Sequence, residues 1–78
     1  MKIHIEYCEK WNYGPEFERV SNIITKHYPD SNIEGNISPP RTGSFVVTIN
    51  NKLKYSKFET NEFPNENEII SWLEKEIL

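Results

Sequence analysis

Three segments of the chain alternate regularly between apolar and polar residues. Residues 2–7, 44–49 and 52–57 each place apolar side chains at every second position. A period of two predicts β-strands with one face buried and one face in water. Strands that are covered on both faces would instead be apolar throughout. We therefore expect a sheet that carries helices on one face only.

Two other segments carry apolar residues at three- and four-residue spacing, which predicts amphipathic helices. The first spans 15–27, since a proline begins it and Pro29 ends it. The second spans 66–77, with Asn65 or Asn67 as its N-cap. Their predicted inward residues are Phe17, Val20, Ile24 and Tyr28 in the first helix and Ile69, Ile70, Leu73 and Ile77 in the second.

The predicted order of elements is β-α-β-β-β-α, with a short strand around Ile33 after the first helix. Because β-α-β crossovers are right-handed, the first two strands should be parallel, and the later hairpin makes the sheet mixed. The fold class is therefore α/β in the broad sense. More narrowly, it is an α+β two-layer sandwich in which both helices lie on one face of the sheet. Residues 1–78 show no repeat or linker, so we expect a single domain.

The segment 44–57 is predicted to be a hairpin. Asn50-Asn51 supplies its turn, because asparagine tolerates positive φ better than most residues. In the return strand, strict alternation places Leu53 and Tyr55 on one face. The face in water is then polar, lined by Lys2, His4, Glu6, Lys52 and Lys54.

Composition excludes several classes of function. The net charge is −3 and basic residues are interleaved with acidic ones, so we expect no nucleic-acid partner. A single cysteine excludes an internal disulfide framework, which indicates a reducing compartment. The two histidines are isolated, and we expect no metal site. No apolar run reaches membrane length and no signal peptide is evident, so we expect a cytoplasmic protein with no membrane partner.

The only cysteine, Cys8, lies in the loop 8–14 between the first strand and the first helix. Unpaired N–H groups and the helix dipole favour a thiolate at such a place. Lys10 would add to this effect, whereas Glu6 and Glu9 would oppose it. The alternative is that Cys8 is simply a small buried apolar residue, which is common for free cysteine.

Three runs of residues together resemble the selenoprotein W-like family, part of the selenoprotein W/T/H group. They are Tyr7-Cys8-Glu9-Lys10-Trp11, Thr42-Gly43-Ser44-Phe45 and Asn51-Lys52-Leu53, in the same order of elements. The resemblance implies a thioredoxin-like fold and a thiol or selenol redox role for a monomer. It implies no cofactor, with glutathione as a co-substrate and protein thiols or disulfides as partners. It also favours the functional interpretation of Cys8.

Position 11 departs from that family's pattern. Members carry a second cysteine or a selenocysteine there, and this chain carries Trp11. Selenocysteine is encoded by UGA, which some genetic codes and expression systems translate as tryptophan. Two interpretations are therefore open: Trp11 stands where the natural protein has selenocysteine, or it is native and the protein is a one-thiol variant. Codon 11 of the gene, UGA or UGG, distinguishes them.

The resemblance also implies binding positions in the loop before the hairpin. Pro39 falls where thioredoxin-like folds carry a cis-proline facing the cysteine, although a plain turn is an equal alternative. Thr42 and Gly43 should return the loop to the sheet, with Gly43 allowing close approach to the Cys8 loop. We accordingly expect a glutathione-dependent oxidoreductase acting through Cys8, together with position 11 if that is selenocysteine. The alternatives are an interaction module that displays Trp11, and a regulatory thiol.

Overall fold

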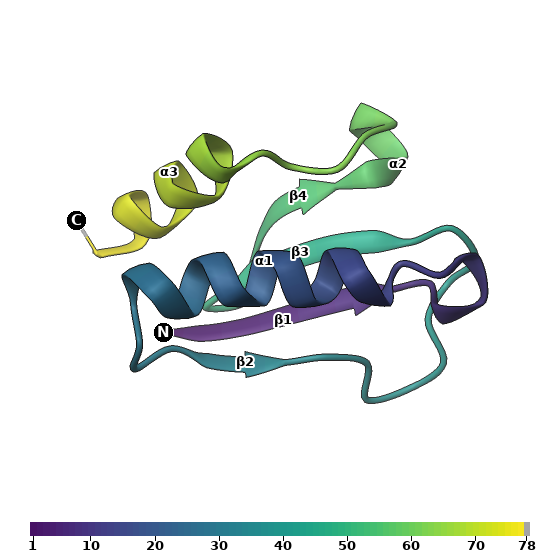
Figure 1. Ribbon diagram of the computed structural model, residues 1–78, viewed down its shortest axis with the longest axis horizontal. Coiled ribbons are helices and arrows are strands. Elements are labelled where there is room, and N and C mark those ends of the chain that lie inside the picture. The colour runs from purple at the N-terminus through teal and green to yellow at the C-terminus, as the bar shows by residue number, and fades with distance from the viewer. Residues whose placement is uncertain (78) are drawn as a thin grey trace.

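The computed structural model describes residues 1–77, which form a four-stranded sheet with helices packed against it (Figure 1). The helical elements and strands are β1 (Lys2–Tyr7), the 3₁₀ turn η1 (Glu9–Trp11), α1 (Gly14–His27), β2 (Asn32–Glu34), β3 (Phe45–Ile49), β4 (Lys52–Ser56), α2 (Lys57–Thr60) and α3 (Glu66–Ile77). None of these helices is long and apolar enough to cross a membrane.

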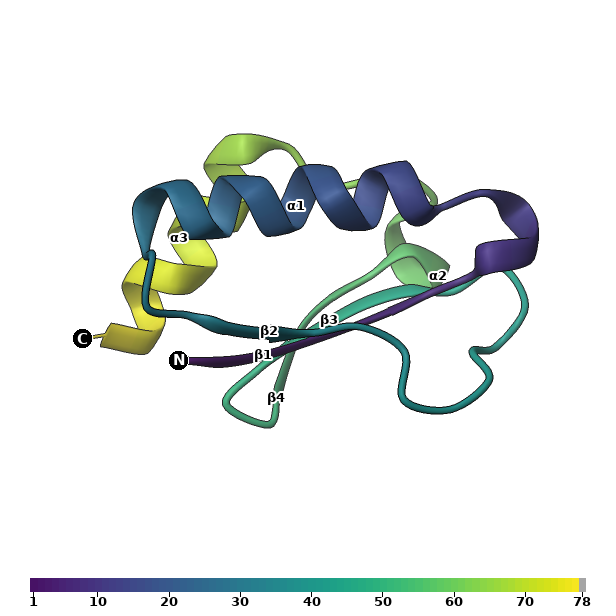
Figure 2. The same cartoon turned by 60° about the horizontal axis from the view of Figure 1, so that its bottom comes forward.

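The sheet has the strand order β2-β1-β3-β4. β1 and β2 are parallel, whereas β1–β3 and β3–β4 are antiparallel, as the crossover and the hairpin predict. Figure 2 shows α1 and α3 on the same side of this sheet. The predicted two-layer sandwich with a mixed sheet is therefore confirmed.

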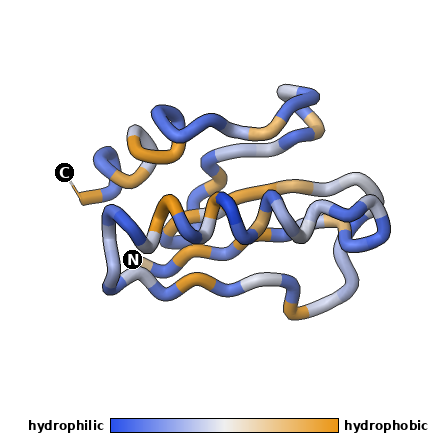
Figure 3. The backbone as a smooth tube through the Cα atoms, in the orientation of Figure 1, coloured by the Kyte–Doolittle hydropathy of each residue, from blue (hydrophilic) through white to orange (hydrophobic). Residues whose placement is uncertain are grey.

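The core lies between the sheet and the two long helices. β3 contributes the most regular pattern, because every second residue of it is buried. Figure 3 shows the corresponding hydrophobic stretch along β3 and the alternating hydropathy of α1. The buried residues of this core cluster are Ile3, Ile5, Val20, Ile24, Phe45, Val47, Ile49, Tyr55, Ile69, Trp72 and Leu73.

The start of α3 is held by a reciprocal cap. The side chain of Asn65 accepts a hydrogen bond from the backbone N–H of Glu68 at 2.8 Å, and the carboxylate of Glu68 accepts one from the N–H of Asn65 at 3.1 Å. This is a capping box, so Asn65 rather than Asn67 is the cap. The predicted inward stripe of α3 is wrong at Ile77, which is exposed, and it omits Trp72, which is buried.

The β3–β4 turn forms as predicted and the return strand spans Lys52–Ser56, but its side chains do not face as predicted. Asn50 and Asn51 have φ values of 51° and 68°, the positive pair that a tight hairpin turn requires. Beyond the turn a β-bulge shifts the register, so that Leu53 pairs with Thr48 and Tyr55 pairs with Val47. The register of the turn places Leu53 opposite Thr48 on the water-facing side, and the extra residue after Leu53 brings Tyr55 into the core. The prediction that the two share a face is wrong.

The register of the turn and the bulge together take two lysines away from the face in water. Lys54 Nζ lies 2.7 Å from the carboxylate of Glu76 on α3, and Lys52 Nζ lies 3.6 Å from it. Both were predicted on the uncovered face, and that prediction is wrong. The strand then ends at Ser56, and Lys57 begins the short helix α2, which the sequence pattern did not indicate.

Candidate functional site

Cys8 lies where β1 ends and the 3₁₀ turn η1 begins. Its backbone N–H donates to the carbonyl of Ser44 at 2.9 Å, and its carbonyl accepts from the N–H of Tyr13 at 3.2 Å. One partner close in sequence and one distant in sequence therefore fix its backbone. The residue is the N-cap of η1, not of α1, which begins six residues later at Gly14. Its side chain is only 2% exposed.

A cavity of about 320 Å³ opens beside Cys8. Its other walls come from η1 and from the loop between β2 and β3, through Glu9, Lys10, Pro39, Pro40 and Thr42. The structure thus brings Pro39 to Cys8, as the resemblance implied, and places Thr42 on the same cavity. The cis-proline interpretation is wrong, however, since residues 1–77 contain no cis peptide bond.

Position 11 and Gly43 lie in contact. Gly43 has a φ of 75°, and a Cβ on it would lie 2.9 Å from Cζ3 of Trp11. Only glycine combines this backbone conformation with such a close approach. The indole of Trp11 is nevertheless 56% exposed, and its edge meets the ring of Tyr13 at a centroid distance of 6.1 Å. The indole does not line the cavity at Cys8.

Asn36 attaches the start of the long loop to β1. Its side-chain amide donates to the carbonyl of Tyr7 at 2.9 Å and accepts from the N–H of Tyr7 at 3.0 Å. One side chain thereby satisfies both backbone hydrogen-bonding groups of Tyr7 beyond the point where the pairing of β1 with β2 ends. Tyr7 is also held by its ring, which stacks on Phe17 with centroids 4.6 Å apart. The residue before Cys8 is therefore fixed by backbone and side chain alike.

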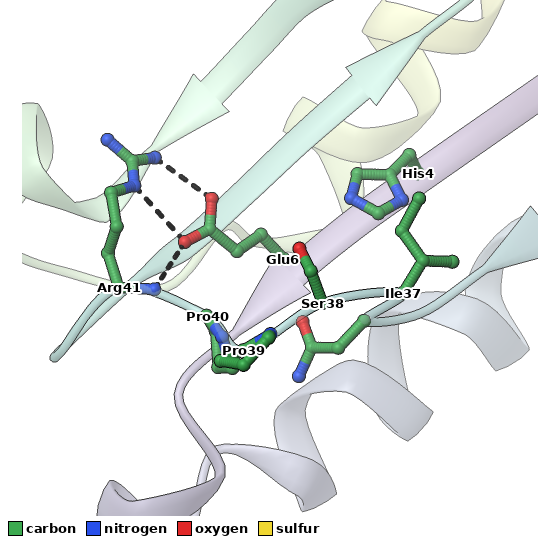
Figure 4. Close-up of a pocket in the computed structure, with 8 residues that line it drawn as sticks. His4, Glu6, Ile37, Ser38, Pro39, Pro40 and Arg41 are labelled. Carbon is green, nitrogen blue, oxygen red and sulfur yellow. Dashed lines mark hydrogen bonds and ion pairs between the residues drawn. The ribbon is translucent and has the colours of Figure 1, made fainter.

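Arg41 attaches the other end of the same loop to β1. Its guanidinium forms two hydrogen bonds with the carboxylate of Glu6, at 3.0 and 3.1 Å, and its backbone N–H donates a third at 2.8 Å (Figure 4). These hydrogen bonds and the charge of Arg41 hold the pKa of Glu6 below its ordinary value, against the opposing effect of burial. The guanidinium also lies 5.0 Å from the ring centroid of the partly exposed Phe58.

Side chains that could bind a metal are scattered over residues 1–77. Within residues 1–77, no three His, Cys, Asp or Glu side chains come close enough together to hold a metal ion. Each histidine instead lies beside a glutamate: His4 is 3.4 Å from Glu34, and His27 is 3.3 Å from Glu66.

Comparison with known proteins places this arrangement in a family. The sequence model of the Rdx family matches residues 2–75. The chain belongs to the Rdx family. Among the relatives of this Rdx chain is selenoprotein W of Danio rerio, 33% identical over 58 residues that cover 73% of the chain and 67% of the relative. Another is migration and invasion enhancer 1 of Bos taurus, 31% identical over 70 residues that cover 90% of the chain and 59% of the relative.

Solved structures agree with the fold of this Rdx chain. A selenoprotein W-related protein from Vibrio cholerae superposes with a TM-score of 0.87 at 16% identity, covering 99% of this chain and 96% of the other. A protein from Bordetella parapertussis superposes with a TM-score of 0.80 at 13% identity, covering 96% and 95%. The chain spans less than 60% of the length of the mammalian relatives it matches. The family assignment made from the sequence motifs is confirmed.

The sequence motifs located part of this site but missed its attachments. Cys8, Pro39 and Thr42 border one cavity, and Gly43 meets Trp11 beside it. The two attachments, Asn36 to Tyr7 and Arg41 to Glu6, join residues 29 and 35 positions apart. Neither has a local signal, because an asparagine or an arginine in a loop is ordinarily a surface residue. Only the tertiary fold identifies them.

Proposed function

We propose that this Rdx-family chain is a thiol-based redox protein in which Cys8 forms mixed disulfides with glutathione or with protein thiols. The observation that supports this is the position of the only cysteine. It ends β1 under a 3₁₀ turn, beside a cavity large enough to receive part of a peptide. A merely structural cysteine does not need a cavity beside it. The family relationship supports redox chemistry in the same direction.

The proposed reaction is thiol–disulfide exchange. The Cys8 thiolate attacks one sulfur of glutathione disulfide, the S–S bond breaks, and one glutathione leaves as a thiolate that takes a proton from water. Cys8 is thereby oxidised to a mixed disulfide while that glutathione is reduced. Attack by a second glutathione thiolate on the glutathione sulfur of the adduct restores Cys8 and releases glutathione disulfide. No metal or organic cofactor takes part, and the cytoplasm would supply the reducing conditions.

Position 11 determines whether a second mode operates. If the natural residue is selenocysteine, it and Cys8 would cycle through a selenenylsulfide, with selenium as the attacking atom. If Trp11 is native, glutathione or a partner thiol must resolve the adduct at Cys8. The observed contact between Trp11 and Gly43 is compatible with a native tryptophan, since the glycine leaves room for the indole.

Intact-mass analysis tests the proposal. The reduced protein is exposed to glutathione disulfide between about pH 5 and pH 9, around the ordinary thiol range. We expect an adduct of one glutathione, absent from Cys8→Ser and reversed by excess glutathione. No adduct on the folded protein at any pH, with an adduct only after denaturation, would refute a redox role for this chain.

A second candidate is an interaction module, and one observation favours it. Trp11 and Phe58 are large aromatic side chains that remain about half exposed. Tryptophan is enriched among residues that dominate protein–protein binding energy. In that case Trp11→Ala would abolish partner binding while Cys8→Ser would leave it intact.

A further inference from the structure

The loop between β2 and β3 has an unusual pattern of attachment. Residues 37–40, the strap, have the sequence Ile-Ser-Pro-Pro, and within residues 1–77 the structure gives their backbone no hydrogen bond. Ile37, its first residue, is 76% exposed. Figure 2 shows this connection extending from the sheet on the side away from the helices. Segments with few buried contacts and unbonded backbone open at low free-energy cost.

Hydrogen bonds join the residues at both ends of the strap to β1. Before it, Asn36 is bound to the backbone of Tyr7 through two hydrogen bonds. After it, Arg41 is bound to the carboxylate of Glu6 through three. Tyr7 and Glu6 are consecutive, and the next residue of the chain is Cys8. The strap therefore begins and ends beside the cysteine.

The strap also forms a wall between two cavities. Pro39 and Pro40 line the cavity at Cys8, and they line a second cavity of about 240 Å³ that contains Glu6, Arg41 and His4 (Figure 4). Movement of the two prolines would join these cavities and uncover Cys8, which is otherwise 2% exposed. A disulfide must bring its sulfur into line with the thiolate, which the closed arrangement restricts.

We propose that the strap closes over Cys8 and that the Glu6–Arg41 ion pair is its latch, so that reaction of Cys8 requires the strap to open. The two attachments differ in kind. Asn36 bonds to backbone and acts as the hinge, whereas the guanidinium of Arg41 is largely exposed and its ion pair can exchange with water or with an anionic substrate. The idea that the strap regulates redox chemistry rests on the proposed function. The idea that the strap limits access to Cys8 can be tested without it.

Alkylation of the native protein by iodoacetamide, which is small and uncharged, measures this access. We expect Glu6→Gln and Arg41→Ala to raise the rate about three- to tenfold, the range for losing a charge-assisted pair near the surface. The double variant should be no faster than the faster single variant, because both remove one latch. Glu74→Gln, the same charge change at an exposed site on α3, should leave the rate unchanged.

A pH profile separates opening from a change in thiol ionisation. Opening multiplies the alkylation rate at every pH and leaves the midpoint of the profile in place, whereas removing a nearby charge shifts the midpoint. The proposal would be overturned if both single variants were alkylated at the wild-type rate. It would also be overturned if a faster rate were fully explained by a shifted midpoint of the pH profile. Should the variants not fold, salt replaces them: alkylation of the wild-type protein should accelerate as salt screens the latch, and a flat response would overturn it.

The same variants distinguish a failure of the strap proposal from a failure of the proposed redox function. If the latch variants are alkylated faster but no variant forms a glutathione adduct, the strap proposal is supported and the redox function is refuted. A glutathione adduct that forms at the same rate in all variants, with unchanged alkylation, supports the redox function and refutes the strap.

Discussion

Replacing Gly43 by alanine tests the contact between position 11 and the loop that returns to the sheet. Two costs can be estimated from the structure. An L-residue at a φ of 75° costs about 1–2 kcal/mol relative to glycine. The added Cβ would also lie 2.9 Å from Cζ3 of Trp11, so the indole must move. Because that ring is more than half exposed, it can swing away, at a cost of about 1 kcal/mol in lost packing and edge contact with Tyr13.

The expected total is about 2–3 kcal/mol, which for a domain of this size lowers Tm by roughly 10–20 °C. Thermal unfolding followed by far-ultraviolet circular dichroism measures it. The decisive comparison is a cycle with Trp11→Ala: without the indole, Gly43→Ala should cost about 1 kcal/mol less, because only the backbone cost remains. Equal costs in the two backgrounds would show that the indole does not rest on Gly43, and the described geometry of position 11 would be refuted.

Three further predictions use other parts of the chain. Asn65→Ala removes the N-cap of α3 and should cost about 1 kcal/mol in urea unfolding; an unchanged midpoint would contradict the capping box. The hydrogen bond and charge of Lys54 lower the pKa of Glu76, so this carboxylate stabilises the fold above its ordinary pKa and the contribution is lost as the pH falls through the lowered value. The stability gap between wild type and Glu76→Gln should therefore be largest near about pH 7 and close towards about pH 3, and a constant gap would contradict the ion pair. Trp11→Cys places a thiol three residues after Cys8, a separation that a disulfide can span across a tight turn. Mild oxidation should then remove two hydrogens from the intact mass, whereas a persistent pair of free thiols would show that the two side chains do not meet.

The outline of the fold follows from local patterns in the sequence. The alternation in β3 matches its observed burial residue for residue, because a strand with one wet face leaves a period of two. The spacing of Val20 and Ile24 places them in the core for the corresponding reason in a helix. The hairpin turn was predictable because Asn50 and Asn51 tolerate the positive φ that it needs.

The return strand shows where local patterns stop being sufficient. Lys52 to Ser56 alternates as well as β3 does, yet Leu53 lies outward opposite Thr48 and a bulge after it turns Tyr55 into the core. The register is set by partners elsewhere: Tyr55 packs against Trp72, with ring centroids 5.4 Å apart, and Lys54 reaches Glu76. Both partners belong to α3, so the strand's own sequence does not contain the information.

The candidate site divides in the same way. The sequence by itself determined that a lone cysteine ends the first strand before a helix, and its motifs pointed to the family. Only the tertiary structure decided that Cys8 is buried and which residues line the cavity beside it. Asn36 and Arg41 reach consecutive residues of β1 from 29 and 35 positions away. Such contacts depend on how two elements meet in space, and a periodic pattern records only which face of each element is buried.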